Sequence, residues 1–226
     1  MKSAHPVPSH VPLRYEFCFP DKKEPGAGLE ESFMSCFTLL DTYDRQTGHL
    51  NAIIETPQGS RNKYKYDPEL CLFKLHSLLP AGASFPYDFG FIPSTLGPDG
   101  DPLDILLLME EAAPGGFLVP ARLIGVIEAE QTDKAGSRVR NDRLIAVSVE
   151  SHHHDTVHSL DDLCQQVVDE IEHFFKSYNA AHGHKFKVRS RHGPQRAAKI
   201  VKQGERLFRQ EQARKEKGKK QARAAG

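Results

Sequence analysis

The chain has 226 residues, enough for one domain with a substantial hydrophobic core and extensions at its ends. Its 30 basic and 30 acidic residues balance overall, but from Lys185 onward 15 Lys and Arg face only 3 Glu, which leaves an acidic body and a basic tail. No apolar run approaches the length of a membrane span, and residues 1–13 lack the apolar centre of a signal peptide, so we expect neither feature.

The cysteine pattern favours a cytoplasmic location. The four cysteines form no Cys-x-x-Cys pair and no even framework of spacings, as expected of reduced thiols in a cytosolic protein: Cys18, Cys36, Cys71 and Cys164. We therefore expect a soluble, cytoplasmic protein.

Residues 1–47 predict an irregular N-terminal arm, because five prolines between Pro6 and Pro25 interrupt any long element. Beyond the arm, short apolar or alternating runs bounded by turn residues predict strands. The expected strands are residues 50–54, 63–66, 71–75, 105–109, 118–130 and 144–149. This spacing is typical of an antiparallel sheet or a small barrel.

Two helices are expected in the last third of the chain. Ser159 and Asp162 form a capping-box pattern, and apolar residues then recur at helical spacing up to Gly183, which predicts a helix over 160–182. Residues 194–213 form a second amphipathic stretch. Residues 214–226 have nothing to bury and predict a frayed helix or disorder.

The most informative stretch is Asp99-Gly100-Asp101-Pro102-Leu103-Asp104, which places three carboxylates in six residues ahead of an apolar strand. Like charges held this close repel one another, and the cost grows as water is excluded. A cation with a preference for hard oxygen ligands, such as magnesium, manganese or calcium, would relieve the repulsion. A solvated acidic turn is the simpler alternative.

The pattern D-G-D-P-L-D resembles the signature of the family I soluble inorganic pyrophosphatases. Further segments resemble the family in the expected order: Glu55 before Pro57, N-K-Y-K-Y-D, F-P-Y-D-F-G-F-I, G-V-I-E-A-E-Q, N-D-R-L-I-A-V and H-F-F-K-S-Y. The resemblance covers roughly residues 50–190. It implies an α+β, mainly β fold: a small, OB-like barrel of five strands flanked by helices. We therefore divide the chain into the arm 1–47, a barrel domain 48–190 and a basic tail 191–226.

The resemblance also implies an activity and a set of site residues. It implies hydrolysis of pyrophosphate with Mg²⁺, or alternatively Mn²⁺, as the cofactor. Asp99 and Asp104 would hold activating metals, with Asp104 bridging two, and Asp101 would be the general base. Further metal ligands would be Asp142, with Asn141 aligned almost as well, and Glu55 and Glu130. Phosphate oxygens would be bound by Lys63 and Arg143, with Tyr178 donating a hydrogen bond.

Several positions depart from the family pattern. Lys65 replaces an expected carboxylate, and strand alternation puts it on the same face as Lys63, so we expect it to bind substrate in place of part of the metal charge. The other departures are His76 or Ser77, Phe85, Phe89, Gln131 and Asn179.

Simpler roles remain open for some of these residues. Glu55 and Glu130 can equally be solvated charges at strand ends, Tyr178 can be a core aromatic, and His152–His154 fits an exposed loop better than a metal site. Two rival functions also remain: a phosphate- or metal-binding module that has lost catalysis, and an OB-like nucleic-acid binder. We do not expect nucleic acid as a partner, because the basic tail lacks interleaved aromatics. We do expect a homo-oligomer.

Overall fold

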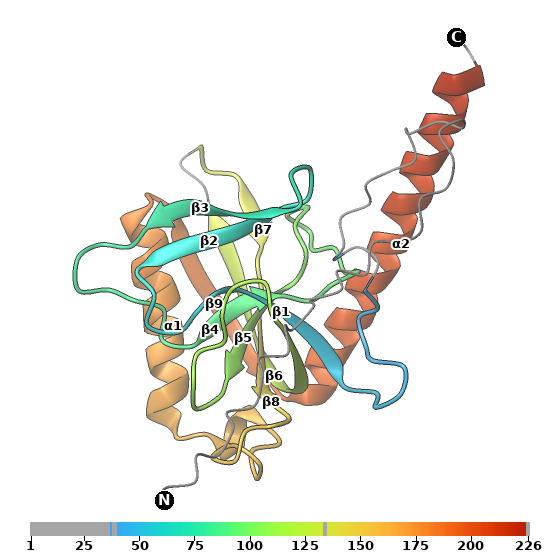
Figure 1. The fold of residues 1–226 in the computed structure, drawn as a ribbon. Coiled ribbons are helices and arrows are strands. Elements are labelled where there is room, and N and C mark those ends of the chain that lie inside the picture. Colours follow the sequence, from blue (N-terminus) through green and yellow to red (C-terminus); the bar gives the residue numbers. More distant parts are fainter. Residues whose placement is uncertain (1–36, 38–39, 133–134, 225–226) are drawn as a thin grey trace, which may run out of the picture. The chain divides into compact units, whose positions relative to one another are not determined.

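The structure, a computed structural model, describes residues 37, 40–132 and 135–224 (Figure 1). Most of the expected N-terminal arm lies outside these residues. The first strands, in chain order, are β1 (Leu50–Thr56), β2 (Asn62–Asp67), β3 (Leu72–Leu78), β4 (Asp88–Phe91) and β5 (Asp104–Leu108). They are followed by β6 (Leu118–Thr132), β7 (Arg138–Arg140), β8 (Arg143–Ser148), the 3-10 turn η2 (Leu160–Asp162), α1 (Gln165–Ala181), β9 (Lys185–His192) and α2 (Pro194–Ala224).

Five of the strands close into a ring. The pairings run β1–β4–β5–β8–β6, and β6 returns to pair with β1. Only β5 and β8 are parallel within this ring, and β7 and β9 extend it by pairing with the far end of β6. The expected mainly β fold with a five-stranded, OB-like barrel is confirmed, although the ring is not evenly barrel-shaped.

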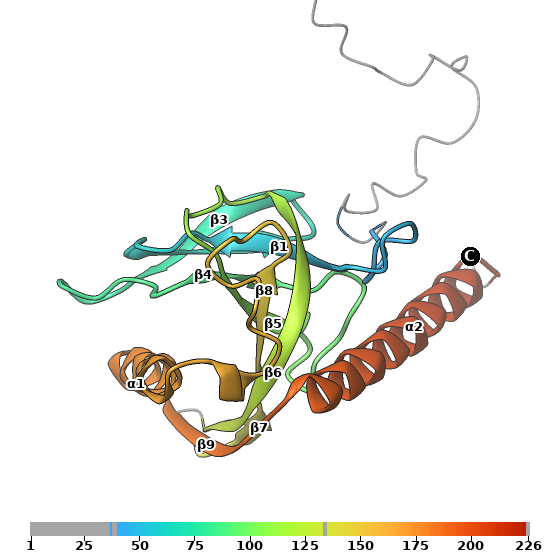
Figure 2. The same ribbon diagram turned by 90° about the horizontal axis from the view of Figure 1, so that it is seen from below.

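The barrel is covered on two sides by helices (Figures 1 and 2). Strand β5 shows why, since its successive residues enter different cores: Ile105 and Leu107 face one cluster, Leu106 and Leu108 the other. Helix α2 completes the first cluster with Ala197, Ile200 and Val201, and α1 completes the second with Val168, Ile171 and Phe175. A continuous apolar strand buried on both faces is what such coverage requires.

A two-stranded hairpin forms a second sheet, separate from the barrel. Strands β2 and β3 pair antiparallel with each other and form their own sheet. Their register shifts after the pair Lys63–Ser77, because Tyr64 pairs with Leu75 and His76 is left without a partner. Such a bulge re-aims the side chain of the extra residue.

Several elements differ from the expectations. Strand β4 is a strand where only core aromatics were expected, and β9 crosses the expected boundary at residue 190. The expected helix 160–182 is interrupted: the capping box of Ser159 and Asp162 is present, but it starts a 3-10 turn, and α1 begins only at Gln165. Helix α2 runs through to Ala224. Within the described residues, none of the helices combines the length and apolarity that crossing a membrane demands.

Candidate active site

A cleft of about 760 Å³ is lined by the acidic loop, the β2–β3 hairpin and residues near the end of α1. It contains most of the residues that the sequence singles out. Those in its lining are Glu55, Lys63, Lys65, Asp99, Asp101, Asp104, Arg143 and Tyr178. Strands β1, β2, β5 and β8 and the loop before β5 thus bring distant parts of the sequence to one surface.

The acidic loop is fixed by its own backbone. The Gly97 N–H donates to the Asp101 carbonyl (2.7 Å), and Gly100 adopts a positive φ of 87°, a conformation that costs glycine little. The Asp101 N–H in turn donates to Asp99 Oδ1 (3.2 Å). Burial raises the pKa of the Asp99 carboxyl, and the charges of Asp104 and Asp101 raise it further. The loop therefore holds carboxylates whose repulsion is not fully compensated.

Arg143 connects the loop to β8. Its Nη1 donates to Asp104 Oδ2, to Asn141 Oδ1 and to the Asp142 carbonyl (3.1 Å). The guanidinium lies over the Phe175 ring, 4.7 Å from its centroid, and the side chain is only 5% exposed. Its Nε is buried and has no hydrogen-bond partner among the described residues. A rigid, buried cation thus stands beside Asp104.

The two lysines of β2 both face the cleft, as alternation predicts. Lys65 Nζ lies 2.8 Å from Asp101 Oδ2. Desolvation works against the charged lysine, but the hydrogen bond to Asp101 and the charges of Asp101, Glu55 and Asp104 together outweigh it, so the pKa of Lys65 is raised. Lys63 Nζ lies between two rings, 5.3 Å from the Phe89 centroid and 5.2 Å from that of Tyr178.

Glu55 is a buried carboxyl at the floor of the cleft. It is 6% exposed, and its Oε1 accepts a hydrogen bond from the Tyr66 N–H (2.7 Å). Desolvation raises its pKa to about 7; the charge of Asp104 adds to the rise, while the Tyr66 hydrogen bond and the two lysines oppose it. The reading of Glu55 as a solvated strand-end charge is therefore wrong.

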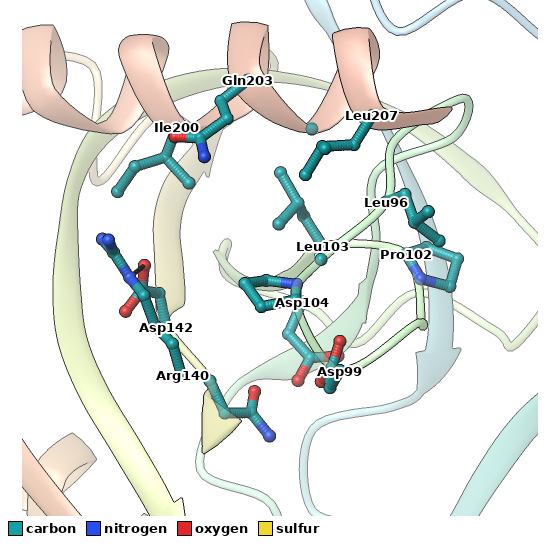
Figure 3. A pocket seen from close by; sticks show the side chains of 14 residues that line it. Leu96, Asp99, Pro102, Leu103, Asp104, Arg140, Asp142, Ile200, Gln203 and Leu207 are labelled. Atoms are coloured by element: carbon teal, nitrogen blue, oxygen red, sulfur yellow. Dashed lines mark hydrogen bonds and ion pairs between the residues drawn. The ribbon is translucent and has the colours of Figure 1, made fainter. Parts of the chain in front are cut away.

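Two expected ligands, Glu130 and Asp142, are not in the lining of the cleft. Glu130 forms an ion pair with Arg189 of β9 and is not in the lining of the cleft, whereas its neighbour Gln131 is. Asp142 accepts from the Ala129 N–H (3.1 Å) and from Arg140 Nε (2.7 Å). It lines a smaller pocket of about 100 Å³ under α2, shared with Asp99 and Asp104 (Figure 3). Asn141, the alternative to Asp142, lines both pockets.

The aromatic residues serve the core and the cleft at once. Phe85 and Phe89 are each 2% exposed and pack with α1, as core packing predicts. Tyr178 packs against the same cluster and stacks on Phe174 (6.0 Å between centroids), yet it also lines the cleft. Both roles considered for Tyr178 are therefore compatible with its position.

Four residues of the lining were not predicted as site residues from the sequence. Gln131 accepts a hydrogen bond from Asn141 Nδ2 (2.9 Å), and His76, His182 and His184 also line the cleft. No motif links these histidines, because they come from β3 and from the turn after α1. These residues can be identified only once the fold brings the two elements together.

Comparison with known proteins agrees with this arrangement. The profile of the inorganic pyrophosphatase family matches residues 52–209. An inorganic pyrophosphatase of Thermus thermophilus is 39% identical over 154 residues, which cover 68% of this chain and 85% of that protein. An inorganic pyrophosphatase of Geobacillus stearothermophilus is 36% identical over 152 residues, which cover 67% of this chain and 89% of that protein.

Solved structures agree as well. The crystal structure of inorganic pyrophosphatase from Thermus thermophilus superposes with a TM-score of 0.68 at 34% identity, covering 75% of this chain and 97% of the other. One from Neisseria gonorrhoeae gives a TM-score of 0.68 at 31% identity, covering 76% and 98%. The match spans the barrel, the acidic loop and the first part of α2, and the chain belongs to the inorganic pyrophosphatase family.

Proposed function

We propose that the protein hydrolyses inorganic pyrophosphate to two phosphates and requires a divalent cation, Mg²⁺ or alternatively Mn²⁺. One observation carries the proposal: the three aspartates of the acidic loop face Lys63, Lys65 and Arg143 within a single cleft. Pyrophosphate is highly anionic, so its hydrolysis needs cationic groups at the phosphoryl oxygens and a base for the attacking water.

The donor set fits a magnesium-like cation. Asp99 and Asp104 offer hard oxygens, and the raised pKa of Asp99 reflects burial and the nearby charge of Asp104, which a cation would offset. Among the described residues, no three His, Cys, Asp or Glu side chains converge as a metal cage. Magnesium is commonly held by one or two carboxylates, waters and substrate phosphates, so Asp99 and Asp104 would suffice. When bound, such an ion neutralises phosphoryl oxygens and acidifies water.

Side chains of the protein would supply the general base and bind the phosphoryl oxygens. Asp101 would accept the proton of the attacking water, and the ammonium of Lys65, 2.8 Å away, holds that carboxylate in place. Lys63 would bind a phosphoryl oxygen directly, because it lies in the cleft between Phe89 and Tyr178. Arg143 would bind another while it fixes Asp104, and the Tyr178 hydroxyl would donate a hydrogen bond.

Phosphate release from pyrophosphate tests the proposal. Purified protein should release phosphate in millimolar magnesium and stop when a chelator is added. Asp101→Asn should cut turnover while leaving magnesium affinity largely intact, whereas Asp104→Asn should weaken both together. Absence of release with the native protein would reject the enzyme and favour the phosphate- or metal-binding module. That alternative is supported by the ion pairs that already engage Asp101 and Asp104.

We also propose a cytoplasmic location and self-association. The described cysteines, Cys71 and Cys164, are free thiols, which suits a reducing compartment. The β2–β3 hairpin exposes four leucines by 56–62%: Leu70, Leu72, Leu75 and Leu78. Apolar side chains gathered on one exposed hairpin fit a contact between copies of the chain. Sedimentation velocity tests this, and a monomer at micromolar concentration would contradict it.

A further inference from the structure

The solvent-facing side of α2 carries a row of basic residues. The row consists of six exposed cations at intervals of three or four residues, with Ala213 at the one position that interrupts it: Lys199, Lys202, Arg206, Arg209, Lys217 and Lys220. Residues at this spacing lie along one face of a helix. The opposite face, which includes Ile200, Val201 and Gly204, is buried. We call the six cations the basic stripe.

The basic stripe has few acidic neighbours in its own helix. The sequence of α2 contains eleven Lys and Arg residues and three Glu residues. Among the described residues, the ion pairs of α2 within 4.0 Å are those of Arg196 with Glu128 and of Arg214 with Glu211, and neither involves the stripe. Like charges three or four residues apart on a helix repel one another and destabilise it. A bound polyanion would offset this repulsion.

Two simpler roles leave most of the stripe unexplained. Cations near a helix C-terminus interact favourably with the helix dipole, but this effect is confined to the last turn, whereas the stripe begins with Lys199 in the second turn of α2. A surface that serves only solubility commonly mixes charges of both signs. A row of charges of one sign instead produces a local potential that attracts the opposite charge.

The dimensions of the stripe suit an extended polyanion. Lys199 and Lys220 are 21 residues apart, which at about 1.5 Å per residue spans about 32 Å of helix. One turn of double-stranded DNA has a similar length, roughly 34–36 Å, and carries one phosphate charge per about 1.7 Å of its axis. The last turns of α2 extend beyond the barrel (Figures 1 and 2), and its free end, Ala213 to Gly218, is exposed. A long partner can therefore lie along the stripe.

The composition of the free end argues against a membrane as the partner. Helices that lie on a bilayer bury an apolar face beside the basic one. The apolar face of α2 packs on the barrel, and after Phe208 the only apolar side chains are alanine methyl groups. Arg214, Lys215 and Lys217 are exposed on different sides of the helix, since each residue turns it by about 100°. A bilayer contacts one side only, whereas the major groove of DNA admits a helix between two rows of phosphates.

Other polyanions fit less well. After Phe208 α2 has no aromatic residue, so the bases of a single strand have no ring on which to stack. This absence weighs against nucleic acid at the level of the sequence, but contacts to duplex phosphates need no aromatic residue. The major groove of double-stranded RNA is deep and narrow. An acidic surface of a second copy is a poorer partner, because carboxylates such as Glu130, Asp169 and Glu172 already pair with cations of their own chain.

We propose that the basic stripe binds the phosphate backbone of double-stranded DNA, independently of base sequence, with the free end of α2 in the major groove. This interaction goes beyond the proposed hydrolysis and does not depend on it, because none of the stripe residues is in the lining of the cleft. The active site and the DNA-binding surface would occupy different parts of the molecule.

Fluorescence anisotropy of labelled DNA duplexes of about 20 base pairs, titrated with the full chain in a chelator, tests the proposal. Affinity should fall about 10³-fold between about 50 and 200 mM salt, as expected for six phosphate contacts. Two duplexes of unrelated sequence should bind equally. The double variant Lys217→Gln, Lys220→Gln should weaken binding at least about tenfold and lower the slope of log affinity against log salt by about two. Both residues are exposed, so the melting temperature should not change.

The matched control is the double variant Lys176→Gln, Lys185→Gln. It removes the same charge from exposed positions on α1 and at the start of β9, and it should bind DNA like the native protein. Competition at equal concentrations of anionic charge compares the duplex with an RNA duplex, polyglutamate and phosphatidylserine vesicles. The DNA duplex should compete best.

Several results would overturn the proposal: no binding of the native protein at about 50 mM salt, an equal loss of affinity in the control, or a competitor as effective as the DNA duplex. A strong preference between the two duplexes would also overturn it, because phosphate contacts carry no sequence information. Stripe-dependent DNA binding by a protein that releases no phosphate from pyrophosphate would support the proposal and reject only the hydrolysis.

Discussion

At the scale of single residues, Lys65 is the most consequential departure from the family pattern. It stands where the resemblance implies a carboxylate, and its ammonium contacts Asp101 at 2.8 Å. With side chains 41% and 53% exposed, the pair adds little to stability, because solvent screens such contacts. Its effect should therefore appear in ligand binding rather than in folding.

Lys65→Glu should raise the KM for pyrophosphate, or shift the magnesium requirement to lower concentration, because it replaces a phosphate-binding cation by a cation ligand. We expect a KM change of about tenfold, the loss typical of a charged hydrogen bond. Steady-state kinetics across a magnesium titration measures both effects. Lys185→Glu makes the same charge change at an exposed position of β9 and should behave like the native protein. No change in either quantity would mean that Lys65 is only a surface residue.

Glu55 gives a second residue-scale prediction, because burial raises its pKa from 4.5 to about 7. Between these values the folded state holds a proton that the unfolded state has released. Stability therefore falls as pH rises from about 4.5 to 7, by roughly 3 kcal/mol at most, and stays reduced above pH 7. Glu55→Gln keeps the acceptor for the Tyr66 N–H and removes the titration.

Melting temperatures of both proteins at pH 5 and pH 8, measured in a chelator, check this prediction. The native protein should lose more stability than the variant over this interval. Glu150→Gln, at an exposed position after β8, serves as the control. Identical pH dependence of the native protein and Glu55→Gln would show that Glu55 remains ionised in the fold.

At the scale of elements, α2 supports the acidic loop. The Leu96 N–H donates to the Gly204 carbonyl (3.1 Å), and a Cβ on Gly204 would lie 2.7 Å from Leu103 Cδ1. Leu103 immediately precedes Asp104. The helix can approach the loop this closely only because residue 204 has no side chain.

Gly204→Ala should displace Leu103 and with it the carboxylate of Asp104. Overpacking costs about 1–3 kcal/mol and outweighs the gain in helix propensity of up to about 1 kcal/mol. We expect a lower melting temperature and a higher magnesium requirement, measured by thermal unfolding and by activity against magnesium concentration.

Gly218→Ala in the same helix is the matched control. A Cβ there meets nothing within 4 Å, so only the propensity gain applies and stability should not fall. Native-like magnesium dependence in Gly204→Ala would refute the view that α2 positions the loop.

The elements also show how far sequence reasoning extends. The acidic loop, the lysines of β2 and the barrel strands follow from local patterns. Strand β9 does not, although Phe186 and Val188 alternate with Lys185, Lys187 and Arg189, because the charges favour a solvated tail and the pairing partner β6 is distant in sequence. The same long-range pairing decides that Gln131, and not Glu130, lines the cleft. Which face of the sheet a side chain takes depends on the register with the partner strand, and that register cannot be read from one strand alone.

At the scale of the whole molecule, the charge asymmetry maps onto the end of α2. The helix contributes buried residues up to Gly204, is half-buried to about residue 212 and is exposed from Ala213 to Gly218. Eight basic and two acidic residues lie between Arg206 and Arg223. The basic tail expected from residue 191 is thus partly a structural element and partly an exposed helix.

Truncation before Arg214 should leave activity and melting temperature nearly unchanged, within about 0.5 kcal/mol, because Arg214 to Gly218 are exposed. Truncation before Gln195 should be strongly destabilising, since it removes Ala197, Ile200 and Val201 from the core. Thermal unfolding of both truncated proteins measures these changes in stability. A large loss on the shorter truncation would show that the end of α2 packs on the body or on another copy of the chain.

The bond between Leu96 and Gly204 also bears on how the protein is made. The acidic loop leaves the ribosome about a hundred residues before the helix turn that supports it, and β9 joins the barrel just as late. A nascent chain that ends before residue 204 therefore carries all three aspartates without the bond that joins the loop to α2. If the loop binds a cation as proposed, we expect that competence to arise only after the helix turn around Gly204 has been synthesised.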